Sequence, residues 1–198
     1  MTRSIARTHI AVAGLMTLLL IAFSAVPAAG AQVQRGHKAE HLAFRLANCI
    51  RTGGWVMKDG RCKDKGSGKH SKYVKPLHRS KRITNQVAWP WAKRSALVYG
   101  QRRCWIGHAR NGSTVNKRFR SVGLKAKVNG ESMGCGFYGG KATTIRLLRM
   151  WQAEKAYRGW HWRNLKDPDF KSAGVGVARL GPRKAMLIFD FYSRSSVS

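Results

Sequence analysis

The sequence predicts an α+β fold in which helices cover both faces of an antiparallel sheet. Apolar residues recur at helical spacing in 38–51 and again in 145–151. Two apolar stretches close the chain, and the turn residues Gly181-Pro182-Arg183 between them are typical of a hairpin. The second stretch, 185–192, is apolar at nearly every position, which indicates a central strand buried on both faces. We therefore expect a helix–sheet–helix sandwich.

Residues 1–31 are predicted to be a signal peptide and not part of this fold. Two arginines precede an apolar run, 10–26, and an Ala-Gly-Ala cleavage site ends at residue 31. The run is short for a membrane span and rich in small residues, so an uncleaved anchor is the less favoured alternative. We expect a secreted, extracellular protein whose single domain spans 32–198 and which meets a membrane only through the signal peptide.

The first predicted helix covers 38–51. Its apolar residues recur at every fourth position from Leu42 to Ile50, and Gly53-Gly54 ends it. The stretch 61–82 is glycine-containing and strongly basic, and we expect it to be a long loop.

A second helix is predicted from about Asn85 to Arg103. Pro90 must then lie in its first turn or kink it, because proline has no amide hydrogen. Partial alternation of apolar residues in 122–133 predicts a strand, and Asn129-Gly130 is expected to interrupt it.

A third helix is predicted to begin at Thr143 or Thr144, either of which can cap it, and to end near Gly159. The hairpin that closes the domain is predicted to pair strands Gly174–Leu180 and Ala185–Tyr192.

The charge of the chain is strongly positive. Lysine and arginine total 38 against eight acidic residues, and loss of the signal peptide lowers the formal net charge from +30 to +28. Such a field attracts polyanions such as an anionic wall polymer, lipid headgroups or acidic glycans. A solvated surface without a specific partner is the alternative. No nucleic-acid motif is present and export argues against a genomic role, so we expect no specific nucleic-acid partner.

Four cysteines follow the predicted cleavage site, and an even number in an exported chain predicts two disulfides with three possible connectivities. A bond between Cys49 and Cys62 would close a short loop around a glycine-rich turn. A bond between Cys104 and Cys135 would tie a helix end to the segment that carries Glu131. The spacing does not match a zinc finger, which needs close cysteine pairs.

Two glutamates and two histidines are the candidate site residues. Glu154 and His161 lie seven positions apart near a helix end, and His108 and Glu131 form a second pair upstream. Two neutral imidazoles are good ligands for Zn²⁺ or another divalent cation, and carboxylates can complete the site or orient the rings. Such a site leaves open positions and would hold its metal weakly. The alternative is a buried polar network without metal.

Ordered pieces of the chain from about Trp89 to Phe191 resemble a known family. The run HWRNLKDPDF at 161–170, followed by GVGV and an aromatic strand, is similar to the C-terminal motif of the CAP superfamily, which includes cysteine-rich secretory proteins, antigen 5 and pathogenesis-related proteins. Trp151-Gln-Ala-Glu154 resembles the family's tryptophan-x-x-glutamate helix. Asn129-Gly130-Glu131-Ser132 resembles its glycine-glutamate-asparagine strand, with serine in place of asparagine, and Gly107-His108 precedes it as the family's first histidine does.

The resemblance implies a CAP-like α-β-α sandwich (SCP-like domain) of bacterial extracellular type. It also implies that His108, Glu131, Glu154 and His161 form a tetrad in a large cleft. The chain departs from the family at residue 162, where tryptophan stands in place of the common arginine, and in the basic loop after Cys62.

Three functions are compatible with these features. The first is a secreted binding module that holds a lipid, glycan or protein in the cleft with the help of a metal. The second is a basic effector that binds polyanions of a cell envelope. The third and least favoured is a hydrolase of wall or ester substrates, using Glu131 and Glu154 or a metal-bound water. The family is not generally enzymatic, so no catalytic residue is assigned.

Overall fold

A computed structural model describes residues 32–99, 107–109 and 112–194 of the chain. The predicted signal peptide lies outside the described residues. None of the helices in the described part of the chain is both long and apolar enough to cross a membrane.

Within the described residues, five strands form one sheet in the order β1-β6-β7-β5, and β4 pairs in parallel with β6 beside β1. The other pairings are antiparallel. The strands are β1 (Val33–Arg35), β4 (His78–Arg79), β5 (Ala126–Gly136), β6 (Ser172–Leu180) and β7 (Lys184–Arg194). The predicted closing hairpin is confirmed as β6–β7.

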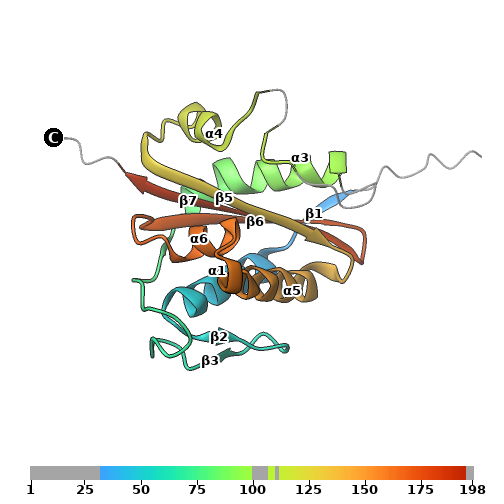
Figure 1. Cartoon of the computed structure of the whole chain (residues 1–198). Coiled ribbons are helices and arrows are strands. Elements are labelled where there is room, and N and C mark those ends of the chain that lie inside the picture. The colour runs from blue at the N-terminus through green and yellow to red at the C-terminus, as the bar shows by residue number, and fades with distance from the viewer. Residues whose placement is uncertain (1–31, 100–106, 110–111, 195–198) are drawn as a thin grey trace, which may run out of the picture. The chain divides into compact units, whose positions relative to one another are not determined.

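Helices cover both faces of this sheet (Figure 1). One face carries α1 (His37–Arg51), α5 (Gly139–Ala153) with its 3-10 continuation η2 (Glu154–Tyr157), and α6 (Trp160–Lys166). The other carries α2 (Lys81–Ile83), the π-helix η1 (Thr84–Ala88), α3 (Trp89–Tyr99) and α4 (Val115–Ser121). The predicted α-β-α sandwich is therefore confirmed.

The core lies on both sides of β7, which runs between β6 and β5. Alternate residues of β7 point to opposite faces, as in any strand. Leu187 and Phe189 pack toward α1 and α5, whereas Met186 and Ile188 pack toward α3. The expectation of a central strand covered on both faces is thus correct.

The helical segment on the second face rests directly on β6. A Cβ atom at Gly174 would lie 2.5 Å from the carbonyl carbon of Ile83, and one at Gly176 would lie 2.5 Å from that of Ala88. Because backbone contacts backbone here, only glycine fits at these two positions. The GVGV motif thus lets the helical layer approach the sheet.

The second predicted helix begins earlier than expected. Its helical segment starts at Lys81, where Ser80 Oγ accepts a hydrogen bond of 3.2 Å from the amide of Ile83. Pro90 is the second residue of α3 and so lies in the first turn of that α-helix, although α2 and η1 precede it. Only Trp89 separates it from the π-helix η1, and such a widened turn accommodates a residue that cannot complete the usual bond to the fourth preceding carbonyl. The predicted end at Arg103 lies outside the described residues.

The strand predicted at 122–133 is shifted and uninterrupted. The short helix α4 was not predicted, and β5 begins only at Ala126. Gly130 pairs with Phe191 inside a continuous ladder, so the expected break there is wrong. Its missing side chain makes room for the ring of Phe170, whose Cζ would lie 2.8 Å from a Cβ atom.

Helix α5 begins at Gly139, so the predicted threonine cap is wrong. Thr144 Oγ1 instead donates 2.8 Å to the carbonyl of Gly140, within the helix. The predicted end near Gly159 is correct, because Arg158 adopts the left-handed conformation there with φ of 54°. Helix α6 follows at once and was not predicted.

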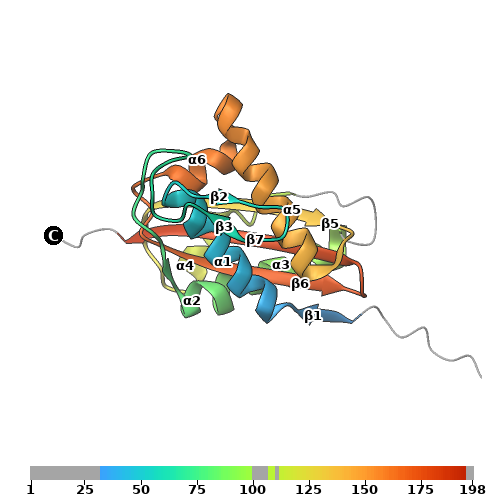
Figure 2. The same cartoon turned by 90° about the horizontal axis from the view of Figure 1, so that it is seen from below.

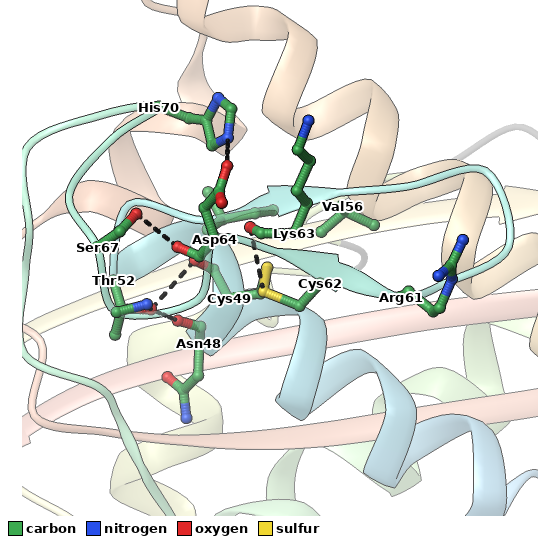
Figure 3. The surroundings of a disulfide bond; sticks show 12 residues. Asn48, Cys49, Thr52, Val56, Arg61, Cys62, Lys63, Asp64, Ser67 and His70 are labelled. Carbon is green, nitrogen blue, oxygen red and sulfur yellow. Dashed lines mark hydrogen bonds and ion pairs between the residues drawn. A yellow bond between two sulfur atoms is a disulfide. The ribbon is translucent and has the colours of Figure 1, made fainter.

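Figure 3 shows the disulfide between Cys49 of α1 and Cys62 of the small β2–β3 hairpin (Trp55–Val56 and Cys62–Lys63), as one of the three connectivities requires. Cys104 lies outside the described residues, so its pairing stays a prediction, and Cys135 lies on β5. Beyond the hairpin, the basic stretch runs mostly as loop. The side chain of Asp64 accepts a 2.7 Å bond from His70 within it.

Candidate functional site

The first predicted pair joins His108 to β5. Nδ1 of His108 lies 2.9 Å from Oε1 of Glu131. The guanidinium of Arg118 on α4 binds the other oxygen of the same carboxylate and donates 2.8 Å to the carbonyl of Ser113. The Glu131 side chain is 2% exposed, whereas that of His108 is 59% exposed. The buried carboxylate of Glu131 therefore holds the imidazole ring of His108 at Nδ1, and much of the ring stays open to solvent.

The second predicted pair lies where α5 passes into α6. Oε1 of Glu154 lies 2.6 Å from Nδ1 of His161, and Oε2 accepts from the amides of His161 at 3.0 Å and Trp162 at 3.3 Å. A Cβ atom at Gly159 would lie 2.5 Å from the same oxygen, so the glycine permits this close approach. The His161 ring also stacks on Trp151, with centroids 5.0 Å apart. The orientation of His161 is therefore fixed on two sides.

Asn164 connects the two pairs. Its Nδ2 donates 2.9 Å to the carbonyl of Glu131 and 3.2 Å to Oγ of Ser132. Ser132, which departs from the family's asparagine, thus serves as an acceptor for α6. The contact fixes α6, the helix that carries His161, against the strand that carries Glu131.

The donor chemistry suits a weak two-nitrogen metal site. Each histidine uses Nδ1 to contact a carboxylate, which leaves Nε2 as the nitrogen free to bind a metal, as in known carboxylate–histidine–zinc arrangements. Within the described part of the chain, no three His, Cys, Asp or Glu residues lie close enough to hold a metal ion together. A metal held by the two imidazoles would therefore keep water or a ligand in its other positions, as in an open site and not a closed structural one.

A cleft of about 290 Å³ adjoins the second pair. Its walls come from β5 and α5 and include Met133, Leu147 and Trp151, and Glu154 and His161 also line it. His108 and Glu131 do not line this cleft. The structure thus brings the four predicted residues into two His–Glu pairs, of which one borders an apolar cleft.

Asp190 is a site residue that was not predicted. It faces Glu131 across the β5–β7 ladder and is completely buried. Neither of its carboxylate oxygens accepts a hydrogen bond from the described residues. Burial, and then the charge of Glu131, raise the pKa of Asp190 well above its ordinary value. Burial next to the Glu131 carboxylate, which also holds His108, therefore favours the protonated form of Asp190.

We expect Asp190→Asn to stabilise the protein at neutral pH by roughly 1–2 kcal/mol. A raised carboxyl pKa means that, above about pH 4, the folded state binds more protons than the unfolded state. The contribution of Asp190 to stability therefore falls as pH rises from about 4 toward the raised pKa. Asparagine has the same shape, carries no charge and has an amide that can donate toward Glu131. Urea unfolding at pH 5 and pH 8 should show a larger gain at pH 8.

The exposed Asp169→Asn is the matched control and should change stability little at either pH. A loss of stability in Asp190→Asn at pH 8 would show that the native carboxylate is charged there.

Comparisons with known proteins show which class of fold this architecture belongs to. No family model and no curated protein matches the sequence. Among solved structures, the chain matches an extracellular protein containing an SCP domain from Bacillus anthracis, with a TM-score of 0.52 and 14% identity over 80% of this chain and 41% of that one. The three layers therefore form a CAP-like fold, and the chain spans 41% of the length of the Bacillus protein.

The chain also matches a particular surface protein, and the match covers the whole length of that protein. An outer surface protein from Borrelia burgdorferi gives a TM-score of 0.56 and 14% identity, covering 83% of this chain and 100% of that one. At this identity the similarity establishes the fold alone.

Proposed function

We propose that the protein is a secreted CAP-fold binding module whose cleft between β5 and α5 takes the apolar part of a ligand. The observation that carries this proposal is the apolar cleft that borders a histidine held by Glu154 and Trp151. Phe137 and Met150, which also line the cleft, are 45% and 56% exposed, and apolar side chains left open in this way mark binding surfaces.

Export is supported by features of the chain and of its structural neighbours. The signal-peptide pattern in 1–31 and the Cys49–Cys62 disulfide both suit an oxidising compartment. The matched Bacillus protein is described as extracellular and the Borrelia protein as an outer surface protein. We infer the same location for this chain.

In this proposal His108 and His161 bind a divalent metal through Nε2. A bound Zn²⁺ would act as a Lewis acid toward an oxygen of the ligand. The chain's own residues hold the two rings in place: Glu131 and Glu154 fix Nδ1 of each, and Trp151 supports the second ring.

A hydrolase is not proposed. The carboxylate pair that glycosidic cleavage would need is Glu131 and Glu154, and both carboxylates are already engaged. Glu131 binds His108 and Arg118, and Glu154 binds the ring and amide of His161. In this geometry each carboxylate orients a histidine, which supports a positioning role for both glutamates.

The double substitution His108→Ala/His161→Ala should weaken Zn²⁺ binding, measured by calorimetry, by about tenfold or more, because it removes both imidazole ligands. The control His37→Ala/His78→Ala removes two exposed histidines elsewhere and should leave the affinity within about twofold. Circular dichroism checks that both variants fold. Unchanged Zn²⁺ affinity in the first variant would refute the metal assignment.

A second candidate function, binding to an anionic envelope polymer, is favoured by where the acidic residues lie. Glu40, Glu131 and Asp190 are buried, and Glu154 is bound to His161. Half of the eight acids are thus engaged inside the fold, which leaves a surface dominated by lysine and arginine. A field of this sign attracts polyanions, with an affinity that falls as salt rises.

A further inference from the structure

A basic cavity of about 740 Å³ lies beside the first turns of α1 and α5, away from the two His–Glu pairs. Figure 2 shows these two helices on the same face of the sheet, and a Cβ atom at Gly140 would lie 3.5 Å from that of Ala39. Basic side chains line it from four segments: Arg35, His37, Lys38, Lys141 and Arg179.

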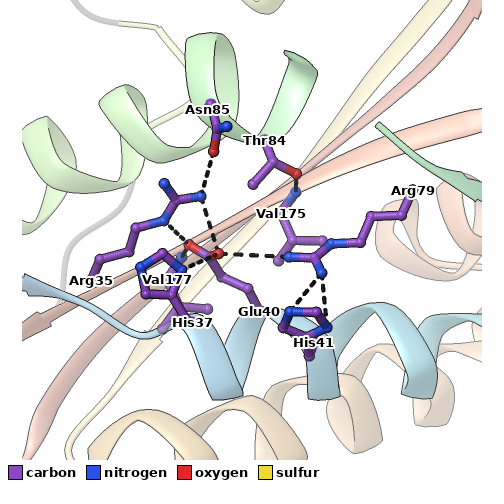
Figure 4. A network of polar contacts seen from close by, with 9 residues as sticks. All are labelled: Arg35, His37, Glu40, His41, Arg79, Thr84, Asn85, Val175 and Val177. Carbon is purple, nitrogen blue, oxygen red and sulfur yellow. Dashed lines mark hydrogen bonds and ion pairs between the residues drawn. The ribbon is translucent and has the colours of Figure 1, made fainter. Parts of the chain in front are cut away.

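Arg35, which lines this cavity, is held in place by the buried carboxylate of Glu40. Nε of Arg35 donates 2.8 Å to Oε1 of Glu40, and its Nη2 donates 2.8 Å to Oδ1 of Asn85 (Figure 4). Glu40 is completely buried, also accepts from the amide of Val177 at 3.3 Å, and lies 3.8 Å from Arg79. Two arginines thus neutralise Glu40, and Arg35 is fixed before any ligand binds.

Opposing charge in the cavity is small. Among its lining residues, Asp59 is the acidic one, and its carboxylate binds Nε of Arg61 at 2.5 Å and the amide of Arg61 at 2.9 Å. These hydrogen bonds from Arg61 lower the pKa of Asp59. Lys38 and Lys141 are exposed, so the lining carries a clear excess of positive charge.

Backbone amides add to this field. Tyr138, which precedes α5, does not cap that helix with a side chain, and the first turn of α5 contains no acid, whereas the first turn of α1 contains Glu40. The amides of a first helical turn that lack such a cap can donate to an anion. At Gly140 the missing side chain lets Arg179 lie against that turn, with its Cδ 3.3 Å from the position of a Cβ atom.

We propose that this cavity binds closely spaced phosphate groups of an anionic polymer. The proposal deepens the second candidate function by naming its site. Guanidinium groups and helix-terminal amides both bind the oxygens of phosphate groups, and several such donors around one cavity suit a ligand with several anionic groups. The cavity is also larger than one phosphate group needs, so it accommodates neighbouring groups of one chain. Glu40 and Asn85 hold Arg35 in place at this cavity, which a merely basic surface does not do.

The test compares two double substitutions that remove the same charge. The first, Lys141→Gln/Arg179→Gln, removes two positive charges from the lining of the cavity. The second, Lys93→Gln/Arg94→Gln, removes two exposed positive charges from α3, which covers the other face of the sheet. Calorimetry with tripolyphosphate at about 150 mM salt, where long-range attraction is screened, should show about tenfold weaker binding for the first variant. The α3 variant should stay within about twofold of the unaltered protein.

Equal weakening in both variants would overturn the site and leave only the general polyanion attraction of the proposed function. No binding of tripolyphosphate by the unaltered protein would overturn both. Should the double variant fail to fold, Lys141→Gln alone, at an exposed position, gives the same comparison against Lys93→Gln. Binding to vesicles of phosphatidylglycerol is measured separately. If the protein binds these vesicles more tightly than tripolyphosphate, and the cavity variant loses that binding, the ligand is a lipid headgroup and not a polymer. Phosphate binding should persist in His108→Ala/His161→Ala, so failure of the metal site is distinguishable.

Discussion

Replacing Arg51 by methionine is expected to lower the free energy of unfolding by about 3–5 kcal/mol. Arg51 is completely buried, and its guanidinium donates to four carbonyls: Lys75 at 3.0 Å, Leu165 at 2.8 Å, Asp167 at 3.0 Å and Phe170 at 3.2 Å. Burial lowers its pKa to about 10, so the group remains charged at neutral pH. Methionine has a similar length but leaves all four carbonyls without these donors.

Urea unfolding measures the effect, and Arg45→Met is the matched control because Arg45 is an exposed arginine on the same helix, α1. Its expected change is within about 0.5 kcal/mol. If the two variants differ by less than about 1 kcal/mol, solvent must replace the guanidinium without cost, and the role assigned to Arg51 is wrong.

The second large effect is expected for Gly176→Ala. The added methyl group would lie 2.5 Å from the carbonyl carbon of Ala88 and 2.7 Å from the amide nitrogen of Trp89, and both atoms belong to backbone. Helix α3 must then move away from β6, which loosens the packing of Trp91 and Ala92 above the sheet. Overpacking of this kind costs about 1–3 kcal/mol, which corresponds to a fall in Tm of about 2–12 °C for a domain of this size.

Thermal unfolding followed by circular dichroism tests this, with Gly140→Ala as the control. At Gly140 the nearest atom is the flexible side chain of Arg179 at 3.3 Å, and alanine favours a helix, so Tm should stay the same or rise slightly. Equal Tm values for Gly176→Ala and the unaltered protein would mean that the helical layer is free to shift on the sheet.

The parts of the fold that the sequence predicts well are those determined by nearby residues. The apolar spacing in 38–51 and the turn at 181–183 correctly predict α1 and the β6–β7 hairpin. Helices α4 and α6 have seven residues each, too short for a period of 3.6 to be recognised. The course of the chain at Gly130 depends on the ring of Phe170, which is remote in sequence, so the glycine alone wrongly suggested a break.

The candidate site was predicted in part. The four candidate residues form two His–Glu contacts, and whether they bind metal stays a prediction. Arg118 and Asn164 could not be assigned, because their contacts with Glu131 depend on how α4 and α6 lie against β5. Asp190 did leave a sign in the sequence: it is the one charged residue in a strand expected to be buried on both faces.

The placement of the acidic residues has a consequence for how this protein can change over time. The ion pairs inside the fold use Glu40 and Glu131 with a few arginines, namely Arg35, Arg79 and Arg118. Most of the lysines take no part in them. Mutation can therefore add or remove surface lysines one at a time without disturbing a buried contact, so affinity for an anionic environment can drift independently of stability. A lineage that changed its surroundings could retune its charge while its scaffold stayed the same.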